Sequence, residues 1–218
     1  MKPRHLLFTI LITSATCLAA QAQGFKFSNE DNAEKEAEAK RAVQMQSLLA
    51  TPCRDKIKNQ KIMVLIGEQR EGRVYANQSS YNTHINAIND RLKALGLKTF
   101  TEAQIRAQVA QAEIDAYFKN DPDAAISASK RLAAQYILRG VIASSAFRNT
   151  MVNVNQVNIS MNFTLTGSNG KMISQTAAKN ESYAGQDVSG MALTLINESA
   201  EEVVARLYSD YCQRAGGK

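Results

Sequence analysis

The sequence predicts an α/β domain with a mixed sheet, parallel in its first part and an antiparallel meander at its end. Residues 62–66 are a continuous apolar run closed by Gly67, which is typical of a strand buried on both faces. Stretches with apolar residues at helical spacing separate this run from the next, at 136–142. Strict alternation of apolar and polar residues over 157–165 then predicts an antiparallel strand with one wet face. The predicted order is β-α-β-α-α-β-β-β-α, preceded by an N-terminal lead-in helix.

The lead-in helix is predicted over residues 30–49, which are rich in Ala, Glu, Lys and Gln. Its large apolar residues gather toward its C-terminal end, so we expect this end alone to dock on a core, and Thr51-Pro52 to stop the helix. After the strand at 61–67, a polar loop runs through Ser80. Apolar residues at helical spacing then predict a helix over 81–95, capped by Gly96.

The middle of the chain begins with a short strand at 97–100. Thr101 and Gln104 form a capping-box pattern that predicts the start of a helix. Its apolar positions are Ile105, Val109, Ala112 and Ala116. Asp121, followed by proline at the first helical position, predicts a further helix that runs to about residue 135.

The last third of the chain predicts a meander and a closing helix. A strand at 136–142 precedes the alternating strand, and Gly167-Ser168-Asn169-Gly170 predicts a hairpin turn into a strand at 171–183. Asp187 then caps a long final helix. The apolar stripe of that helix consists of Ile196, Ala200, Val203, Leu207 and Tyr211.

The N-terminus has the pattern of a cleavable secretory signal peptide. Lys2 and Arg4 precede the apolar run 6–12, and Ala20-Gln21-Ala22 is an A-x-A signature that predicts cleavage after Ala22. The apolar run is about half the length that a membrane span needs. The residues before Cys17 lack the leucine and the final small residue of a lipobox, so we expect no lipid anchor there.

This interpretation divides the chain into four parts. They are a signal peptide (1–22), a leader with the helical lead-in (23–57), a single α/β domain (58–214) and a tail (215–218). After cleavage we expect no transmembrane segment, because no second apolar stretch is long enough. The predicted location is the bacterial periplasm.

Charge and cysteines narrow the class of protein. The formal charge of +6 includes Lys2 and Arg4, so the mature chain carries 26 − 2 = 24 basic and 20 acidic residues. The densest basic cluster lacks aromatic residues, and we expect no nucleic-acid partner. That cluster comprises Arg54, Lys56, Lys58 and Lys61. Cys53 and Cys212 are the two cysteines left after cleavage, and an even pair in an oxidising compartment predicts a disulfide.

Motifs of catalytic chemistry are incomplete. The G-x-x-x-x-G spacing at 67–72 resembles a phosphate loop, but Arg73 and Val74 stand where its lysine and hydroxyl residue are needed, so a turn is the favoured interpretation. His84 is the one histidine of the mature chain, and a structural role is favoured over a catalytic one. We therefore predict no catalytic residues, no metal site and no cofactor.

The polar side of the alternating strand is the candidate binding face. It carries Asn158, Ser160, Asn162 and Thr164. The solvated side of an antiparallel sheet is the favoured interpretation of such a row. Binding is the alternative, because asparagine is a poor strand former and its repetition here costs local propensity.

The layout resembles the small envelope α/β domains of the TolB N-terminal, LpoB, CsgG and FlgT kind. The resemblance covers about residues 61–212 and rests on the leading strand, the helix that ends at Leu95-Gly96, the phrase at 133–140, the hairpin at 166–171 and the closing helix. It implies a non-catalytic module that binds protein partners in envelope assemblies. Such assemblies include outer-membrane, secretion, peptidoglycan and flagellar complexes.

Three functions remain as hypotheses. The leading one is an exported periplasmic interaction protein that supports an envelope assembly through envelope proteins not yet identified. The second is an envelope hydrolase that uses His84 with nearby carboxylates. The third is a periplasmic protein that binds small ligands or glycans on the polar hairpin face.

Overall fold

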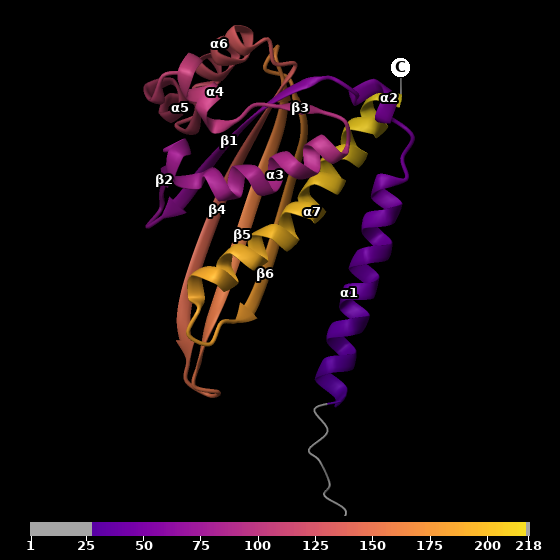
Figure 1. Cartoon of the computed structure of the whole chain (residues 1–218), viewed down its shortest axis with the longest axis vertical. Coiled ribbons are helices and arrows are strands. Elements are labelled where there is room, and N and C mark those ends of the chain that lie inside the picture. The colour runs from indigo at the N-terminus through magenta and orange to yellow at the C-terminus, as the bar shows by residue number, and fades with distance from the viewer. Residues whose placement is uncertain (1–27, 217–218) are drawn as a thin grey trace, which may run out of the picture. The chain divides into compact units, whose positions relative to one another are not determined.

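The computed structural model describes residues 28–216 (Figure 1). The predicted signal peptide (1–22) and Cys17 lie outside the described residues. The first helix, α1, covers Ser28–Leu49, and the boundary between two compact units falls inside it, after Ala39. The second unit begins at Lys40, and Leu49 packs against its core. The predicted lead-in helix is therefore present, and its C-terminal end docks as expected.

The second unit is an α/β domain whose element order roughly matches the predicted one, with additional short elements. Its helices are α2 (Arg54–Ile57), α3 (Asn82–Ala94), α4 (Glu102–Gln108), α5 (Gln111–Phe118), α6 (Pro122–Leu132) and α7 (Val188–Gly216), with a 3-10 helix η1 (Gln78–Tyr81). Its strands are β1 (Lys61–Arg70), β2 (Arg73–Tyr75), β3 (Lys98–Thr99), β4 (Tyr136–Asn149), β5 (Val154–Gly167) and β6 (Met172–Tyr183).

The strands form one mixed sheet in the order β2-β1-β4-β5-β6, and β3 pairs with β1. Strand β1 runs parallel to β3 and β4, whereas β4, β5 and β6 form an antiparallel meander. This arrangement confirms the predicted fold class. In the register of the central strands, Gly140 of β4 lies between Ile66 of β1 and Phe163 of β5.

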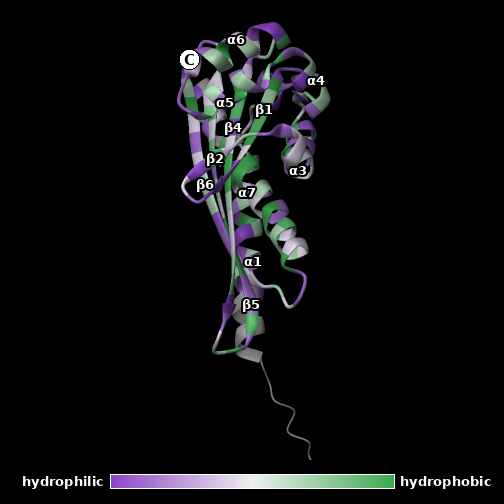
Figure 2. Cartoon of the chain, turned by 90° about the vertical axis from the view of Figure 1, so that its left-hand side faces the viewer, coloured by the Kyte–Doolittle hydropathy of each residue, from purple (hydrophilic) through white to green (hydrophobic). Residues whose placement is uncertain are grey.

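Apolar side chains form a core on each face of the sheet. Val64 and Ile66 of β1 join the larger core beneath α3 and α7, and these two helices lie on one side of the sheet (Figure 2). Met63 and Leu65 point the other way, into the core formed with α4, α5 and α6. The continuous apolar run in β1 follows from burial on both faces.

The predicted turn and cap residues act as expected. The Thr101 hydroxyl accepts a hydrogen bond from the Gln104 N–H, and the Gln104 side chain accepts one from the Thr101 N–H. Carboxylate oxygens of Asp121 and Asp187 accept backbone N–H bonds at the starts of α6 and α7. Gly96 ends α3 with φ +98°, in the left-handed region that glycine favours.

Three stretches differ from the sequence expectations. Strand β1 continues past Gly67 and turns at Glu71-Gly72 into β2, where a polar loop was expected. The single helix expected after Thr101 is two, because Val109 is extended and the Glu113 carboxylate accepts the Ala110 N–H to start α5. Strand β4 runs to Asn149, not to residue 142, because β5 pairs with its whole length. Strand pairing decides the first and the third of these boundaries, and a local cap decides the second.

The predicted disulfide joins Cys53 to Cys212, with a Cα–Cα distance of 5.5 Å and a sequence separation of 159. It ties the segment before β1 to the C-terminal part of α7. Tyr208, one turn earlier on α7, donates a hydrogen bond to the Thr51 carbonyl at 2.6 Å and accepts one from the Cys53 N–H at 3.3 Å. The two ends of the domain are therefore held by a covalent bond and by two hydrogen bonds beside it.

Replacing both cysteines, Cys53→Ser with Cys212→Ser, should lower the free energy of unfolding by up to about 5 kcal/mol. The reason is that the bridge closes a long loop and restricts the unfolded chain. Chemical denaturation of the oxidised protein and of the double variant measures the difference. Reduced wild-type protein should match the variant, and equal stability of all three forms would contradict a stabilising role.

Gly140 is a packing constraint at the centre of the sheet. A Cβ atom there would lie 2.7 Å from the Ile66 Cδ1 and would overlap the Phe163 ring. Both side chains are fully buried, so neither has room to move. The space above Gly140 is therefore filled by its neighbours on β1 and β5.

Gly140→Ala should destabilise the fold by about 1–3 kcal/mol, because it overpacks this contact. Combining it with Phe163→Leu, which makes room at the same point, should cost less than the sum of the two single changes. A double-mutant cycle in urea measures the coupling. Strictly additive losses would show that the ring does not limit residue 140.

Candidate functional site

The polar row of β5 lies on the sheet face opposite α7. Val157, Ile159 and Met161 are buried beneath that helix, whereas Asn162 is exposed and Asn158, Ser160 and Thr164 are half-buried. The structure therefore brings the four predicted residues together on one face, at alternate positions of a single strand. Their use in binding remains a prediction.

The neighbouring strands complete this surface. Across β5, Lys179 of β6 pairs with Ser160, and Glu181 pairs with Asn158. Small residues flank Asn162, with Val141 on β4 and Ala177 on β6. We use the term hairpin face for the polar row of β5 together with its flanking residues on β4 and β6. These flanking residues are Val141, Ala143, Ser145, Ala177, Lys179 and Glu181. It offers hydrogen-bonding groups, two opposite charges and small apolar patches.

Arg139 closes one end of the hairpin face. Its guanidinium lies over the rings of Tyr117 and Phe118, 5.5 and 5.1 Å from their centroids, and donates to the Phe118 carbonyl at 3.1 Å. A cation on an aromatic face is attracted by the ring quadrupole. Arg139 thus fixes α5 to β4 next to Thr164, its partner on β5. No local pattern in the sequence indicates this role, because the contacts join α5 to β4.

The other end of the hairpin face exposes apolar side chains that sequence analysis did not single out. Phe147 and Tyr183 are about half exposed, and each pairs directly with Gln156 from opposite sides. Met151 and Val152 stand in the turn between β4 and β5, with exposed fractions of 94% and 55%. The signal in the sequence was a pair of adjacent hydrophobic residues, Met151-Val152, between polar ones.

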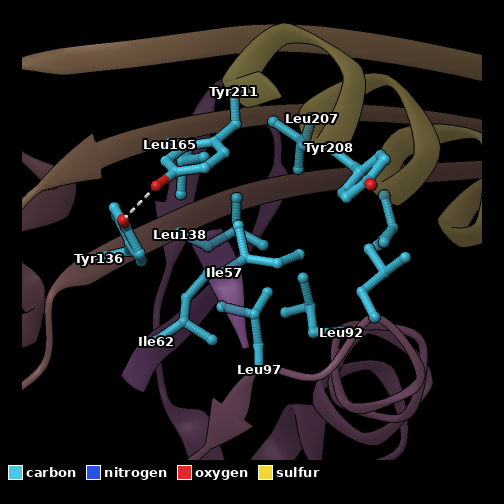
Figure 3. Close-up of a pocket in the computed structure, with 12 residues that line it drawn as sticks. Ile57, Ile62, Leu92, Leu97, Tyr136, Leu138, Leu165, Leu207, Tyr208 and Tyr211 are labelled. Atoms are coloured by element: carbon cyan, nitrogen blue, oxygen red, sulfur yellow. Dashed lines mark hydrogen bonds between the residues drawn. The ribbon is translucent and has the colours of Figure 1, made fainter. Parts of the chain in front are cut away.

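An apolar pocket opens between the sheet, α3 and the C-terminal part of α7 (Figure 3). The phenol groups of Tyr136 and Tyr211 are hydrogen-bonded at 2.8 Å at one side of it. Burial, together with that hydrogen bond, raises the pKa of the Tyr136 phenol far above its usual value. The cavity measures about 30 Å³, which is small beside a typical ligand pocket.

His84 lies in the first turn of α3 and is half-buried. Burial lowers the pKa of its imidazole, although the negative charge of Glu68 acts in the opposite direction. Glu68 also forms an ion pair with Arg70 at 2.6 Å. The Glu68 carboxylate thus acts on His84, and the lowered pKa favours the neutral imidazole, so this pair does not by itself exclude the hydrolase hypothesis.

The stretch that resembles a phosphate loop is a β-hairpin. Gly67 lies within β1, and Glu71-Gly72 form the turn into β2. A Cβ at Gly67 would lie 2.6 Å from a methyl carbon of Val74 and 2.8 Å from the Phe118 ring, so glycine serves close packing here. The favoured interpretation of this segment as a turn agrees with the structure. Most of the basic cluster, from Arg54 to Lys58, is exposed around α2.

Among residues 28–216 there is no group of three or more His, Cys, Asp or Glu side chains placed to hold a metal ion. No helix in that range is both long and apolar enough to cross a membrane.

His84→Gln should flatten the pH dependence of stability between about pH 7.5 and 5.5. Because the folded-state pKa is depressed, the unfolded chain binds the proton more readily, and wild-type stability should fall as pH falls through the usual histidine value. Urea denaturation across this range measures the slope. A variant with the wild-type slope would show that another group titrates. If deleting the gene has a measurable effect on the cell envelope and the His84→Gln variant restores the wild-type state, that result would contradict the hydrolase hypothesis.

No family model and no curated protein matches the chain. It is similar to the solved structure of lipoprotein GNA1162 from Neisseria meningitidis, with 14% identity and a TM-score of 0.46 over 66% of this chain and 97% of that one. The hypothetical protein CT253 from Chlamydia trachomatis also has 14% identity and a TM-score of 0.46, over 71% of this chain and 99% of that one. The LpoB C-terminal domain from Salmonella enterica has 18% identity and a TM-score of 0.39, over 62% of this chain and 94% of that one. LpoB is one of the four groups in the sequence resemblance. At such scores the likeness is one of layout and carries no functional argument.

Proposed function

We propose that this protein is an exported, non-catalytic module that binds a protein partner of the bacterial cell envelope through its hairpin face. The observation that carries the proposal is the asymmetry of the β4–β6 meander. One side is buried under α7, and the other presents Asn162 and Lys179 exposed among small residues. This surface places hydrogen-bonding groups around small apolar areas, an arrangement found toward the polar rim of protein interfaces.

The chemistry of the hairpin face suits a polypeptide partner. Its amides and hydroxyls both donate and accept hydrogen bonds, so they can pair with main-chain and side-chain groups alike. Lys179 and Glu181 add charges of opposite sign two residues apart on β6. Such charges select and orient a partner more than they add affinity. Arg139 keeps this part of the sheet rigid by tying it to α5.

Export is the second component of the proposal. It is supported by the charged, apolar and A-x-A segments of residues 1–22, and the Cys53–Cys212 bridge suits an oxidising compartment. Outer-membrane, secretion, peptidoglycan and flagellar assemblies all fit this description.

A photo-crosslinking residue at Asn162 should give a discrete adduct with an envelope protein in living cells, because this position is exposed at the centre of the hairpin face. The matched control is the same residue at Glu201, an exposed position on α7. Adding Ser160→Arg should reduce the adduct at Asn162. Equal adducts at both positions, or none at Asn162, would contradict the proposed interface.

Export is tested by mass spectrometry of the protein from fractionated cells. The expected product is periplasmic, begins at Gln23 and carries the intact disulfide. An unprocessed N-terminus in the cytoplasmic fraction would contradict export without bearing on the hairpin face.

A further inference from the structure

Four of the seven large hydrophobic side chains that are exposed in the described residues gather at the tip of the β4–β5 hairpin. Met151 and Val152 occupy the turn. Phe147 and Tyr183 lie behind the turn, on either side of Gln156. We call these four residues the apolar tip. The hairpin projects beyond the start of α7 in Figure 1, and residues 144–148 of β4 are all exposed. The turn is coloured hydrophobic in Figure 2.

Hydrogen bonds hold the turn in this shape. The Asn149 side-chain oxygen accepts from the Met151 N–H at 3.0 Å and from the Val152 N–H at 3.4 Å. Arg148 donates to the Asn153 side-chain oxygen at 2.9 Å, across the base of the turn. Asn153 has φ +56°, a conformation that asparagine tolerates better than most residues. The exposure of Met151 is therefore built into the turn and does not come from a loose loop.

Polarity changes in order along the hairpin. The aliphatic side chains occupy the turn, Arg148 and Asn155 pair behind them, and the two aromatic rings follow at the level of Gln156. The one charged residue between 146 and 156 is Arg148, so the hairpin end itself carries positive charge. The Glu181 carboxylate of β6, which accepts a hydrogen bond from the Gln156 side chain at 3.4 Å, lies behind it. In a bilayer the hydrocarbon lies deepest, and aromatic side chains share the interface with polar, anionic headgroups. A tip with aliphatic residues foremost, and with a cation, amides and rings together behind them, fits that arrangement.

We propose that the apolar tip inserts into the headgroup region of a membrane that contains anionic lipid. The site goes beyond the proposed function, because it is separate from the hairpin face around Asn162. Met151 and Val152 enter the acyl boundary, Phe147 and Tyr183 lie at the level of the headgroups, and the Arg148 guanidinium contacts lipid phosphate.

A bilayer is a better fit than a protein groove for this shape. The apolar tip is convex and narrow, whereas a stable protein interface buries about 800 Å² on each partner. Backbone groups that enter a membrane must be satisfied internally. The ladder between β4 and β5 runs up to the pair Asn149–Val154, and Asn149 satisfies two N–H groups of the turn itself. A wedge of this kind enters lipid without needing a complementary pocket.

The chain contains no tryptophan, which allows a site-specific test. The full chain is expressed with Val152→Trp, purified as the cell processes it, and mixed with vesicles of phosphatidylethanolamine and phosphatidylglycerol. The tryptophan emission should shift to the blue and be quenched by lipids brominated near the headgroup end of the acyl chain. The matched control is Met172→Trp, at a half-exposed methionine at the opposite end of β6 from Tyr183. Its emission should not change.

A second set of variants measures binding by vesicle flotation. Met151→Asp with Val152→Asp should weaken binding at least about tenfold, because it removes apolar area and adds repulsive charge. Met172→Asp should bind as wild type, and Arg148→Gln should lose affinity for anionic vesicles alone. Unshifted emission from Val152→Trp, or unchanged flotation of the double variant, would overturn the proposal. Loss of the protein adduct at Asn162 in the double variant, without vesicle binding by wild type, would assign the tip to a protein partner instead.

Discussion

The packing of Ile66 and Phe163 over Gly140 joins the three central strands of this domain. Each strand contributes one residue to the contact, and the missing side chain of Gly140 lets the other two fill the space above β4. The parallel pair β1–β4 and the antiparallel pair β4–β5 meet there, so the contact fixes the register where the sheet changes direction. α7 packs over this region, and the surfaces on the opposite side of β5 depend on the same register.

The domain is cross-linked at one end, which we call the closed end, and carries a projecting hairpin at the other, which we call the open end. At the closed end, the Cys53–Cys212 bridge and the Tyr208 hydrogen bonds hold the segment before β1 against α7. At the open end, β4 and β5 continue as a pair that carries Phe147 and the turn residues into solvent. A rigid scaffold with a projecting hairpin is a common way to present binding residues at a fixed distance from a core.

The two proposed contacts share one strand pair but differ in chemistry. The hairpin face around Asn162 is polar and flat, whereas the apolar tip around Met151 is convex and hydrophobic. A protein that touches lipid with its tip would hold its hairpin face roughly perpendicular to the membrane surface, because both lie along β5. The proposed envelope partner would then meet that face from the side.

The sequence by itself determined the elements that depend on local chemistry. Capping at Thr101 and Asp121 was predictable, and so was the alternation along β5, because each depends on neighbours within a few residues. Two cysteines in a chain predicted to be exported indicated their bridge. The tertiary structure decided what depends on contacts between different elements: the extension of β4 to Asn149, the ring contacts of Arg139 and the carboxylate that acts on His84. Periodicity cannot report these features, because it describes one segment at a time and each of them needs a second strand or helix.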